Sequence, residues 1–101
     1  MILYNVTVGI DRDVEQEWLE WMIDVHIPDV MSTGLFKSYQ IYKMLSQEEE
    51  EGPSYSIQYF AEDMNHIELY LEEHAPGLIQ KHMALFKNKH VAFRSLLEKI
   101  G

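Results

Sequence analysis

The sequence contains no cysteine, which excludes disulfide bonds, thiolate metal ligands and a thiol nucleophile. Basic residues are also scarce, since 8 Lys and Arg stand against 17 Asp and Glu and give this acidic protein a formal charge of −9. Such a charge repels phosphate groups, so we expect neither nucleic acid nor an anionic membrane as a partner. No apolar run approaches the roughly 20 residues that span a bilayer, and the first residues do not resemble a secretory signal. We therefore expect a soluble, cytoplasmic protein.

The five glycines are scattered along the chain, which excludes a glycine-rich phosphate-binding loop. No serine stands in the glycine elbow of a serine hydrolase. What the chain does contain is apolar: hydrophobic residues make up 47% and aromatic residues 12%, enough for a packed core. At 101 residues the chain has the usual size of one domain, and we expect a single domain over residues 1–101.

The first predicted elements are a strand and the start of a helix. Residues 2–10 alternate between a strongly apolar face and a second, mixed face, which is the period of two expected of a strand. Either Asp11 or Asp13 then supplies a helix N-cap. Gln16 lies three residues after Asp13 and completes a pattern that resembles a capping box.

The helix that follows is amphipathic. Its apolar residues recur at intervals of three and four and predict a buried stripe of Val14, Trp18, Trp21, Met22 and Val25. Proline disfavours helix at the residue before it, so Pro28 predicts an end near His26, with one further turn allowed before Gly34.

The middle of the chain predicts a hairpin. Residues 35–45 and 53–61 are rich in aromatic and β-branched side chains and predict two strands. Residues 46–52, SQEEEEG, carry four successive glutamates that repel one another, so we expect an exposed loop there.

The last third predicts a helix in two parts and a final strand. Asp63 is expected to cap the helix, Pro76-Gly77 to break or kink it, and residues 78–89 to resume it. Residues 90–100 are ambiguous between helix and strand, although alternation favours a strand at their start.

The order strand, helix, strand, strand, helix, strand predicts an α+β, ferredoxin-like βαββαβ fold, a four-stranded antiparallel sheet with both helices on one face. The other face would display Leu3, Asn5 and Thr7 together with tyrosines of the second and third strands. A monomer rarely leaves such an apolar, aromatic face in water. Two sheets packed face to face would bury it, so we predict a homodimer.

The histidines do not predict a metal site. His66, His74, His82 and His90 are spaced eight residues apart. On a helix that interval separates successive imidazoles by roughly 12 Å along the axis, too far for one ion, so we interpret the spacing as chance and the side chains as solvent-exposed. Glu17, Glu20 and Asp24 are interpreted as a solvated helix face. We expect neither a metal nor a cofactor.

His26 stands apart because it lies where the first helix is expected to end. One interpretation is a histidine that caps backbone carbonyls, where the helix dipole favours a cation. The other places the imidazole between helix and sheet, near strand tyrosines, where it could act as an acid or base or bind a polar group.

A pocket in that gap would draw on other residues as well. Asn5 and either Tyr39 or Tyr59 are the candidate polar groups, and Trp18 or Trp21 the candidate wall. The alternatives remain open: the tryptophans could simply pack the core, and Asn5 could bond to a neighbouring backbone or to a dimer partner.

Several phrases resemble those of known proteins. Residues 18–22 read WLEWM, residues 26–36 read HIPDVMSTGLF and residues 91–95 read VAFRS. The chain resembles the dimeric α+β barrel superfamily and, over nearly its whole length, a family of uncharacterised bacterial proteins of this size. The resemblance implies a ferredoxin-like homodimer with a pocket between sheet and helices, close to His26.

The wider superfamily includes quinol-type and haem-degrading monooxygenases, isomerases and decarboxylating enzymes. Asn5 is similar to the strand asparagine of the haem-degrading members, but no tryptophan follows Trp21, where the sequence departs from them. A shared fold does not define an activity. Two hypotheses result: a homodimer that binds or transforms a small organic molecule, and a non-catalytic protein–protein interaction module.

Overall fold

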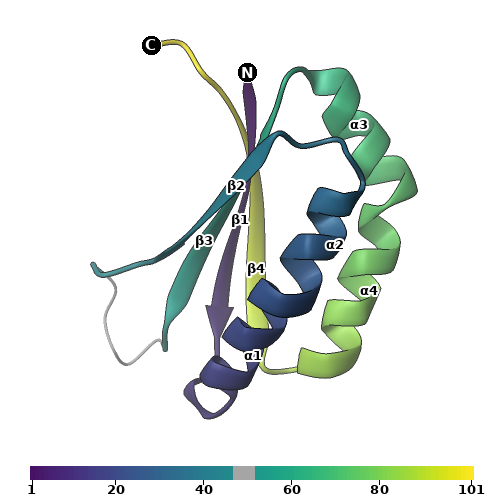
Figure 1. Ribbon diagram of the computed structural model, residues 1–101. Helices are drawn as coiled ribbons and strands as arrows, with labels where there is room; N and C mark the ends of the chain where they lie inside the picture. The colour runs from purple at the N-terminus through teal and green to yellow at the C-terminus, as the bar shows by residue number, and fades with distance from the viewer. Residues whose placement is uncertain (47–51) are drawn as a thin grey trace.

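The computed structural model describes residues 1–46 and 52–101 and has two layers (Figure 1). One layer is a four-stranded antiparallel sheet in the order β2-β3-β1-β4, with the helices on one face. The strands are β1 (Ile2–Ile10), β2 (Ser38–Lys43), β3 (Ser54–Ala61) and β4 (His90–Glu98). The helical segments are η1 (Arg12–Val14), α1 (Glu15–Trp21), η2 (Met22–His26), α2 (Ile27–Ser32), α3 (Met64–Glu73) and α4 (Ala75–Phe86). The predicted ferredoxin-like α+β fold is confirmed.

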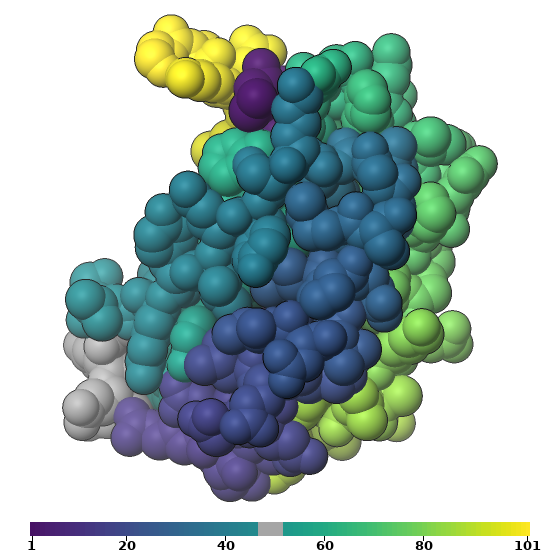
Figure 2. Space-filling view, viewed as in Figure 1, coloured from purple at the N-terminus to yellow at the C-terminus, as the bar shows by residue number. Residues whose placement is uncertain are grey.

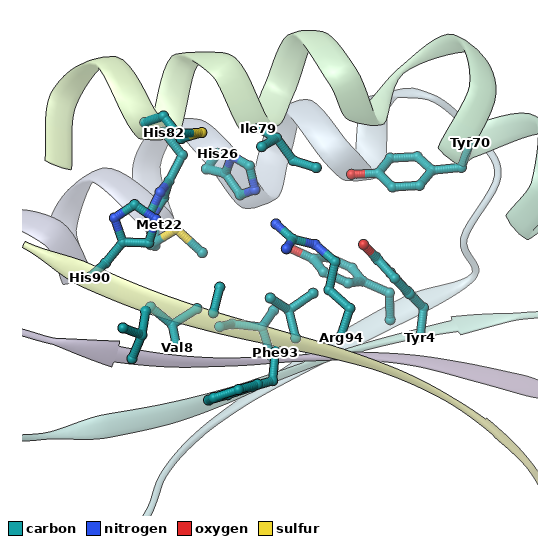
Figure 3. Close-up of a pocket in the computed structure, with 16 residues that line it drawn as sticks. Tyr4, Val8, Met22, His26, Tyr70, Ile79, His82, His90, Phe93 and Arg94 are labelled. Carbon is teal, nitrogen blue, oxygen red and sulfur yellow. The ribbon is translucent and has the colours of Figure 1, made fainter. Parts of the chain in front are cut away.

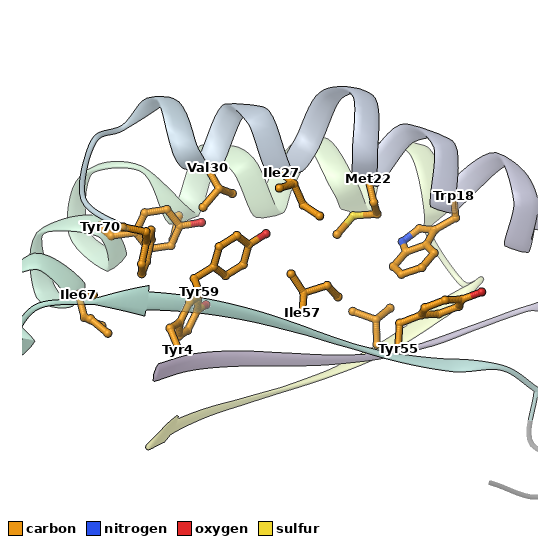
Figure 4. Close-up of a cluster of buried hydrophobic side chains, with 14 of the residues drawn as sticks. Tyr4, Trp18, Met22, Ile27, Val30, Tyr55, Ile57, Tyr59, Ile67 and Tyr70 are labelled. Carbon is orange, nitrogen blue, oxygen red and sulfur yellow. The ribbon is translucent and has the colours of Figure 1, made fainter. Parts of the chain in front are cut away.

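The alternation of β1 decides which side chains face the helices. Tyr4 pairs with Tyr59 of β3 and with Leu96 of β4, and side chains directly opposite one another share a face of the sheet. Beneath the helices lies the core, shown in Figure 4. Its largest fully buried side chains are Trp18, Tyr59, Ile27, Ile57, Ile67 and Val30.

The opposite face of the sheet, called the open face below, is not covered by any helix (Figure 1). It carries Leu3, Asn5 and Thr7 as predicted, but the expectation for the tyrosines was mostly wrong. Tyr55 and Tyr59 pair with even-numbered residues of β1 and therefore face the helices. The apolar side chains of the open face include Tyr42, Val91, Phe93 and Leu97, which are exposed at 51%, 61%, 69% and 48%.

The first helix continues beyond His26 to Ser32, which agrees with the further turn allowed before Gly34, although the regular α-helix α1 already ends at Trp21. Met22–His26 form a π turn, in which the Ile27 N–H donates to the Met22 carbonyl five residues earlier. The register thus shifts by one residue just before Pro28, where the missing N–H would interrupt an α-helix.

The same shift changes which side chains are buried. Trp18 and Met22 are buried as predicted, but Val25 is 42% exposed and Ile27 takes the next buried position. The extra residue of the π turn explains the step of five between Met22 and Ile27.

The predicted capping box is also wrong. Asp11 occupies the N-cap position without a side-chain cap bond. Asp13 instead pairs with Lys89, whose Nζ lies 2.9 Å from Asp13 Oδ2. Gln16 donates its Nε2 hydrogen to Glu20.

The remaining elements follow the sequence more closely. Asp63 caps α3 as predicted, because its carboxylate accepts the His66 N–H at 3.1 Å. The break expected at Pro76 is found, although α4 already begins at Ala75. The ambiguous end of the chain is a strand over 90–98. Of the predicted acidic loop, residues 47–51 lie outside the described residues.

Figure 2 shows the atoms of α1 and α2 packed directly against those of the edge strand β2 on this face of the molecule. The two ends of the chain lie side by side, where the Lys99 N–H donates to the Met1 carbonyl at 3.1 Å. Within the two described ranges, no helix is both long and apolar enough to cross a bilayer.

Candidate functional site

A cavity of about 420 Å³ lies between the β1–β4 half of the sheet and the helices (Figure 3). Val8 and Ala92 belong to its floor on the sheet. Ile79 of α4 and Met22 of η2 close it from the helix side. This volume is within the range of sites that bind small molecules.

Arg94 provides the cationic group of the cavity. It pairs with Val6 and therefore shares the face of the sheet that is turned toward the helices. Its guanidinium points from β4 into the cavity, beside Tyr4 and toward the imidazole of His26 (Figure 3). It bonds to the Tyr4 hydroxyl, and this bond and the positive charge oppose the burial that raises the Tyr4 pKa.

Three tyrosines converge at this end of the cavity. The rings of Tyr59 and Tyr70 lie with their centroids 6.2 Å and 5.8 Å from that of Tyr4. Burial raises the pKa of both Tyr59 and Tyr70, so their hydroxyls keep their protons at neutral pH. The Tyr59 side chain is 2% exposed, and its hydroxyl has no hydrogen-bond partner among the described residues.

Two further histidines lie at the other end of the cavity. Trp18 Nε1 donates to His82 Nε2 at 2.8 Å, and because the indole can only donate, this nitrogen must be the acceptor. The neutral His82 ring therefore carries its proton on Nδ1. His90 Nδ1 lies 2.9 Å from the Phe86 carbonyl, and the His82 and His90 ring centroids are 4.5 Å apart. Burial, reinforced by the neighbouring His90, lowers the His82 pKa to about 4.

His26 lies between these groups and Arg94 in the cavity lining. Burial lowers its pKa to about 4, with Asp29 acting in the opposite direction and Arg94 and Lys81 adding to the decrease. The imidazole is therefore neutral at pH 7 and packs on Trp21, with centroids 5.2 Å apart. The interpretation of His26 as the cap of a helix end is wrong, because the helix continues beyond it.

The other predicted site residues are placed differently. Tyr59 lines the cavity with His26, whereas Trp18 and Trp21 lie behind the imidazoles and outside the lining. Tyr39 pairs with Tyr59 at the edge strand β2, is 40% exposed and does not reach the cavity. The structure thus brings Tyr59 and His26 to one cavity and leaves the tryptophans and Tyr39 outside it.

Asn5 does not share the gap with His26. Its side chain lies on the open face, because Asn5 is an odd-numbered residue of β1. There it donates to Thr7 Oγ1 at 3.1 Å and accepts from Ser56 Oγ at 2.6 Å. Asn5 therefore bonds to neighbouring side chains of the sheet and takes no part in the cavity.

Sequence reasoning missed Tyr4, Tyr70, His82, His90 and Arg94. Alternation in β4 gave no signal for the arginine, because the apolar Val91, Phe93 and Leu97 stand on the other side of the strand. The spacing of the histidines was interpreted along a continuous helix, whereas the turn through Asn88, with φ of 64°, folds β4 back against α4. The expected solvent exposure of His82 is wrong, as this side chain is 9% exposed. In residues 1–46 and 52–101, no three His, Asp or Glu side chains are grouped to hold a metal ion.

The fold of the chain and its match to a family model identify the group of proteins to which it belongs. The four-stranded antiparallel sheet with the helices on one face is a ferredoxin-like α+β fold, and the cavity lies between its two layers. The chain belongs to the family described as "Domain of unknown function (DUF4286)", whose model matches residues 1–100. No curated protein matches the chain.

Solved structures share this fold at low sequence identity. A protein of the EthD family from Bacillus halodurans has a TM-score of 0.70 at 9% identity, covering 99% of this chain and 100% of that one. SnoaB, a cofactor-independent oxygenase from Streptomyces nogalater, has a TM-score of 0.66 at 13% identity, covering 97% and 92%. A hydroxynitrile lyase from Passiflora edulis has a TM-score of 0.64 at 8% identity, covering 99% and 96%. At these identities the likeness concerns the fold alone.

Proposed function

We propose that the protein is a homodimer of single-domain subunits, each of which binds a small organic molecule in the cavity beside His26. The observation that carries the proposal is the cavity itself, about 420 Å³ in volume, with an apolar floor and several polar groups at its helix side. A non-catalytic interaction module would need no such space, so the cavity favours the small-molecule hypothesis.

The state of His26 limits the chemistry that we propose for it. With a pKa of about 4, the imidazole is uncharged at pH 7. It is therefore better suited to hydrogen bonding or to acting as a weak base than to acting as a general acid. Tyr59 is the proposed orienting group, because its hydroxyl is free to bond to a ligand. We also propose that the cavity works without a cofactor, and the cofactor-independent oxygenase shows that a protein of this fold can do so.

The homodimer is proposed from the open face. Phe93 and Leu97 are exposed on it at 69% and 48%, and a second copy of the same face would bury these apolar side chains in a symmetric interface. A cytoplasmic location is proposed because a chain without cysteine suits a reducing compartment.

The cavity can be tested by filling it. Ala92 lies in the floor, so Ala92→Phe should occupy the space, whereas Ala84→Phe adds the same ring to an exposed position of α4. We expect wild type and Ala84→Phe to bind 2-naphthamide in calorimetric titration and Ala92→Phe to lose at least tenfold in affinity. Equal binding by all three proteins would contradict the proposal, as would a wild type that binds neither 2-naphthamide nor its carboxylate analogue 2-naphthoate.

His26 can be tested in the same titration. His26→Ala should weaken binding of 2-naphthamide while leaving the circular dichroism spectrum unchanged, because the imidazole lines the cavity. Unchanged affinity would remove His26 from the proposed site.

A further inference from the structure

The charge of the cavity is positive in a protein whose net charge is negative. Of the described residues that line the cavity, Arg94 alone belongs to the fully charged types. No described carboxylate forms an ion pair with its guanidinium; its neighbour is the neutral hydroxyl of Tyr4. Arg94 is exposed to solvent, and a guanidinium that lines a concave space without a carboxylate partner is suited to a ligand that brings the negative charge.

The neighbouring imidazoles do not compete for this role. His26 and His82 are neutral at pH 7, so they add no positive charge beside Arg94. The attraction for an anion is therefore concentrated at the Arg94 end of the cavity, where the hydroxyls of Tyr4 and Tyr70 lie (Figure 3) and the ring of Tyr59 packs near that of Tyr4.

The second, independent observation is the hydroxyl of Tyr59. A buried hydroxyl without a partner is unfavourable, and proteins rarely leave one unless a ligand or water completes it. Figure 4 shows this side chain rising from the sheet with its oxygen toward the helices. Because its pKa is raised, the hydroxyl is a donor and needs an acceptor.

We propose, on the basis of the ligand-binding function proposed above, that the natural ligand is a small monoanion whose carboxylate or enolate oxygen is bound by Arg94 and Tyr59. Its body is largely apolar, because Val8, Met22 and Ile79 bound the space beyond these two groups together with the uncharged rings of His26 and His82. The ligand is thus a cyclic or aromatic acid, or an acidic enol, rather than a sugar, a phosphate ester or a neutral hydrocarbon.

The charge can be tested with two ligands of nearly equal size. We expect wild-type protein to bind 2-naphthoate at least tenfold more tightly than 2-naphthamide in calorimetric titration near neutral pH. Arg94→Gln should reduce that ratio to about one, whereas Lys99→Gln, which makes the same change of net charge at the exposed end of the chain, should preserve it.

The two failures are distinguishable. Equal affinities for naphthoate and naphthamide in wild type, or a ratio unaffected by Arg94→Gln, would overturn the anion assignment and leave the cavity function standing. Absence of binding by both compounds would remove both proposals.

The hydroxyl can be tested through the opposite directions of two effects. Tyr59→Phe removes an unpaired buried hydroxyl, so the ligand-free protein should keep or raise its melting temperature while binding 2-naphthoate roughly tenfold more weakly. Tyr55→Phe is the matched control on the same strand and face, because the Tyr55 hydroxyl donates to Glu15 at 2.6 Å. It should lower the melting temperature and leave binding unchanged. A loss of stability in Tyr59→Phe with unchanged binding would show a structural hydroxyl and contradict the assignment.

Discussion

His82 illustrates how a single contact fixes the state of a side chain. The indole of Trp18 occupies its Nε2, so a proton added there would break a buried hydrogen bond of 2.8 Å. Together with burial, this contact makes the protonated ring unfavourable, in agreement with a pKa of about 4. The ring faces the cavity in one defined tautomer.

The lowered pKa predicts how stability depends on pH. An unfolded chain protonates His82 near its ordinary pKa of 6.5, whereas the folded protein does so only near 4. Between these values the unfolded state binds more protons, so this contribution, on the order of 3 kcal/mol, is present above pH 6.5 and is lost as the pH falls toward 4. His82→Gln keeps an acceptor for Trp18 but cannot titrate.

Urea denaturation of both proteins across this pH range measures the effect. We expect the free energy of unfolding of the variant to fall less steeply between pH 6.5 and pH 4 than that of the wild type. Parallel curves would show that His82 does not contribute.

For single residues, the sequence predicted a role only where the chemistry of the side chain itself indicated one. Of the two interpretations of His26, the helix cap is wrong, whereas an imidazole between helix and sheet near strand tyrosines agrees with its place in the cavity lining. Asn5 and Tyr59 lie on opposite faces of the sheet, because alternate residues of a strand point to opposite faces and the pairing register carries this alternation to the next strand. The sequence predicted the face on which Asn5 lies, but not on which face of the sheet the cavity lies.

Among the elements, the contact of α1 with α4 depends on the two tryptophans in different ways. Trp18 is completely buried and hydrogen-bonded to His82. Trp21 is partly buried and packs on His26 and Phe86 through its ring. Both residues were predicted to belong to one buried stripe, and the structure separates their roles.

Phenylalanine substitutions measure this difference. Trp18→Phe removes buried surface and leaves His82 Nε2 without its donor, so we expect a loss of about 3 kcal/mol in the free energy of unfolding. Trp21→Phe removes ring surface only and should cost about 1 kcal/mol. Chemical denaturation at pH 8 checks both values, and equal losses would contradict a stabilising role of the Trp18–His82 bond.

Element order was predictable, whereas element ends were less so. Alternation in β1 and the Asp63 cap are strong local signals, and both predictions are confirmed. The π turn at Met22–His26 was not predictable, since its formation depends on how the helix packs on the sheet. Pro28 was correctly identified as a perturbation, but tertiary contacts preserve the helix through it.

For the whole molecule, the open face leads to a test of assembly. Leu97 lies on this face at 48% exposure, and Leu85 is an equally apolar residue of α4 at 59% exposure. If two sheets pack face to face, Leu97→Lys should bury a charge in the interface and yield monomers. Leu85→Lys should leave the dimer intact.

Analytical ultracentrifugation distinguishes the two variants. We expect a dimer for the wild type and Leu85→Lys, and a folded monomer for Leu97→Lys at the same concentration. A monomeric wild type, or a Leu97→Lys variant that stays dimeric, would contradict assembly through this face.

The π turn has one consequence for how this helix can change in evolution. It gives the helix one residue more than a regular α-helical path would need. Loss of a single codon between those for Met22 and His26 would restore a regular α-helix, in which Met22 and Ile27 are four residues apart and both keep their buried positions. The reading frame and the buried residues on either side of the turn would be preserved, whereas the side chains of the turn itself, which include that of His26, would change their directions. Small in-frame deletions in this segment would therefore alter the chemistry of the cavity more readily than its fold.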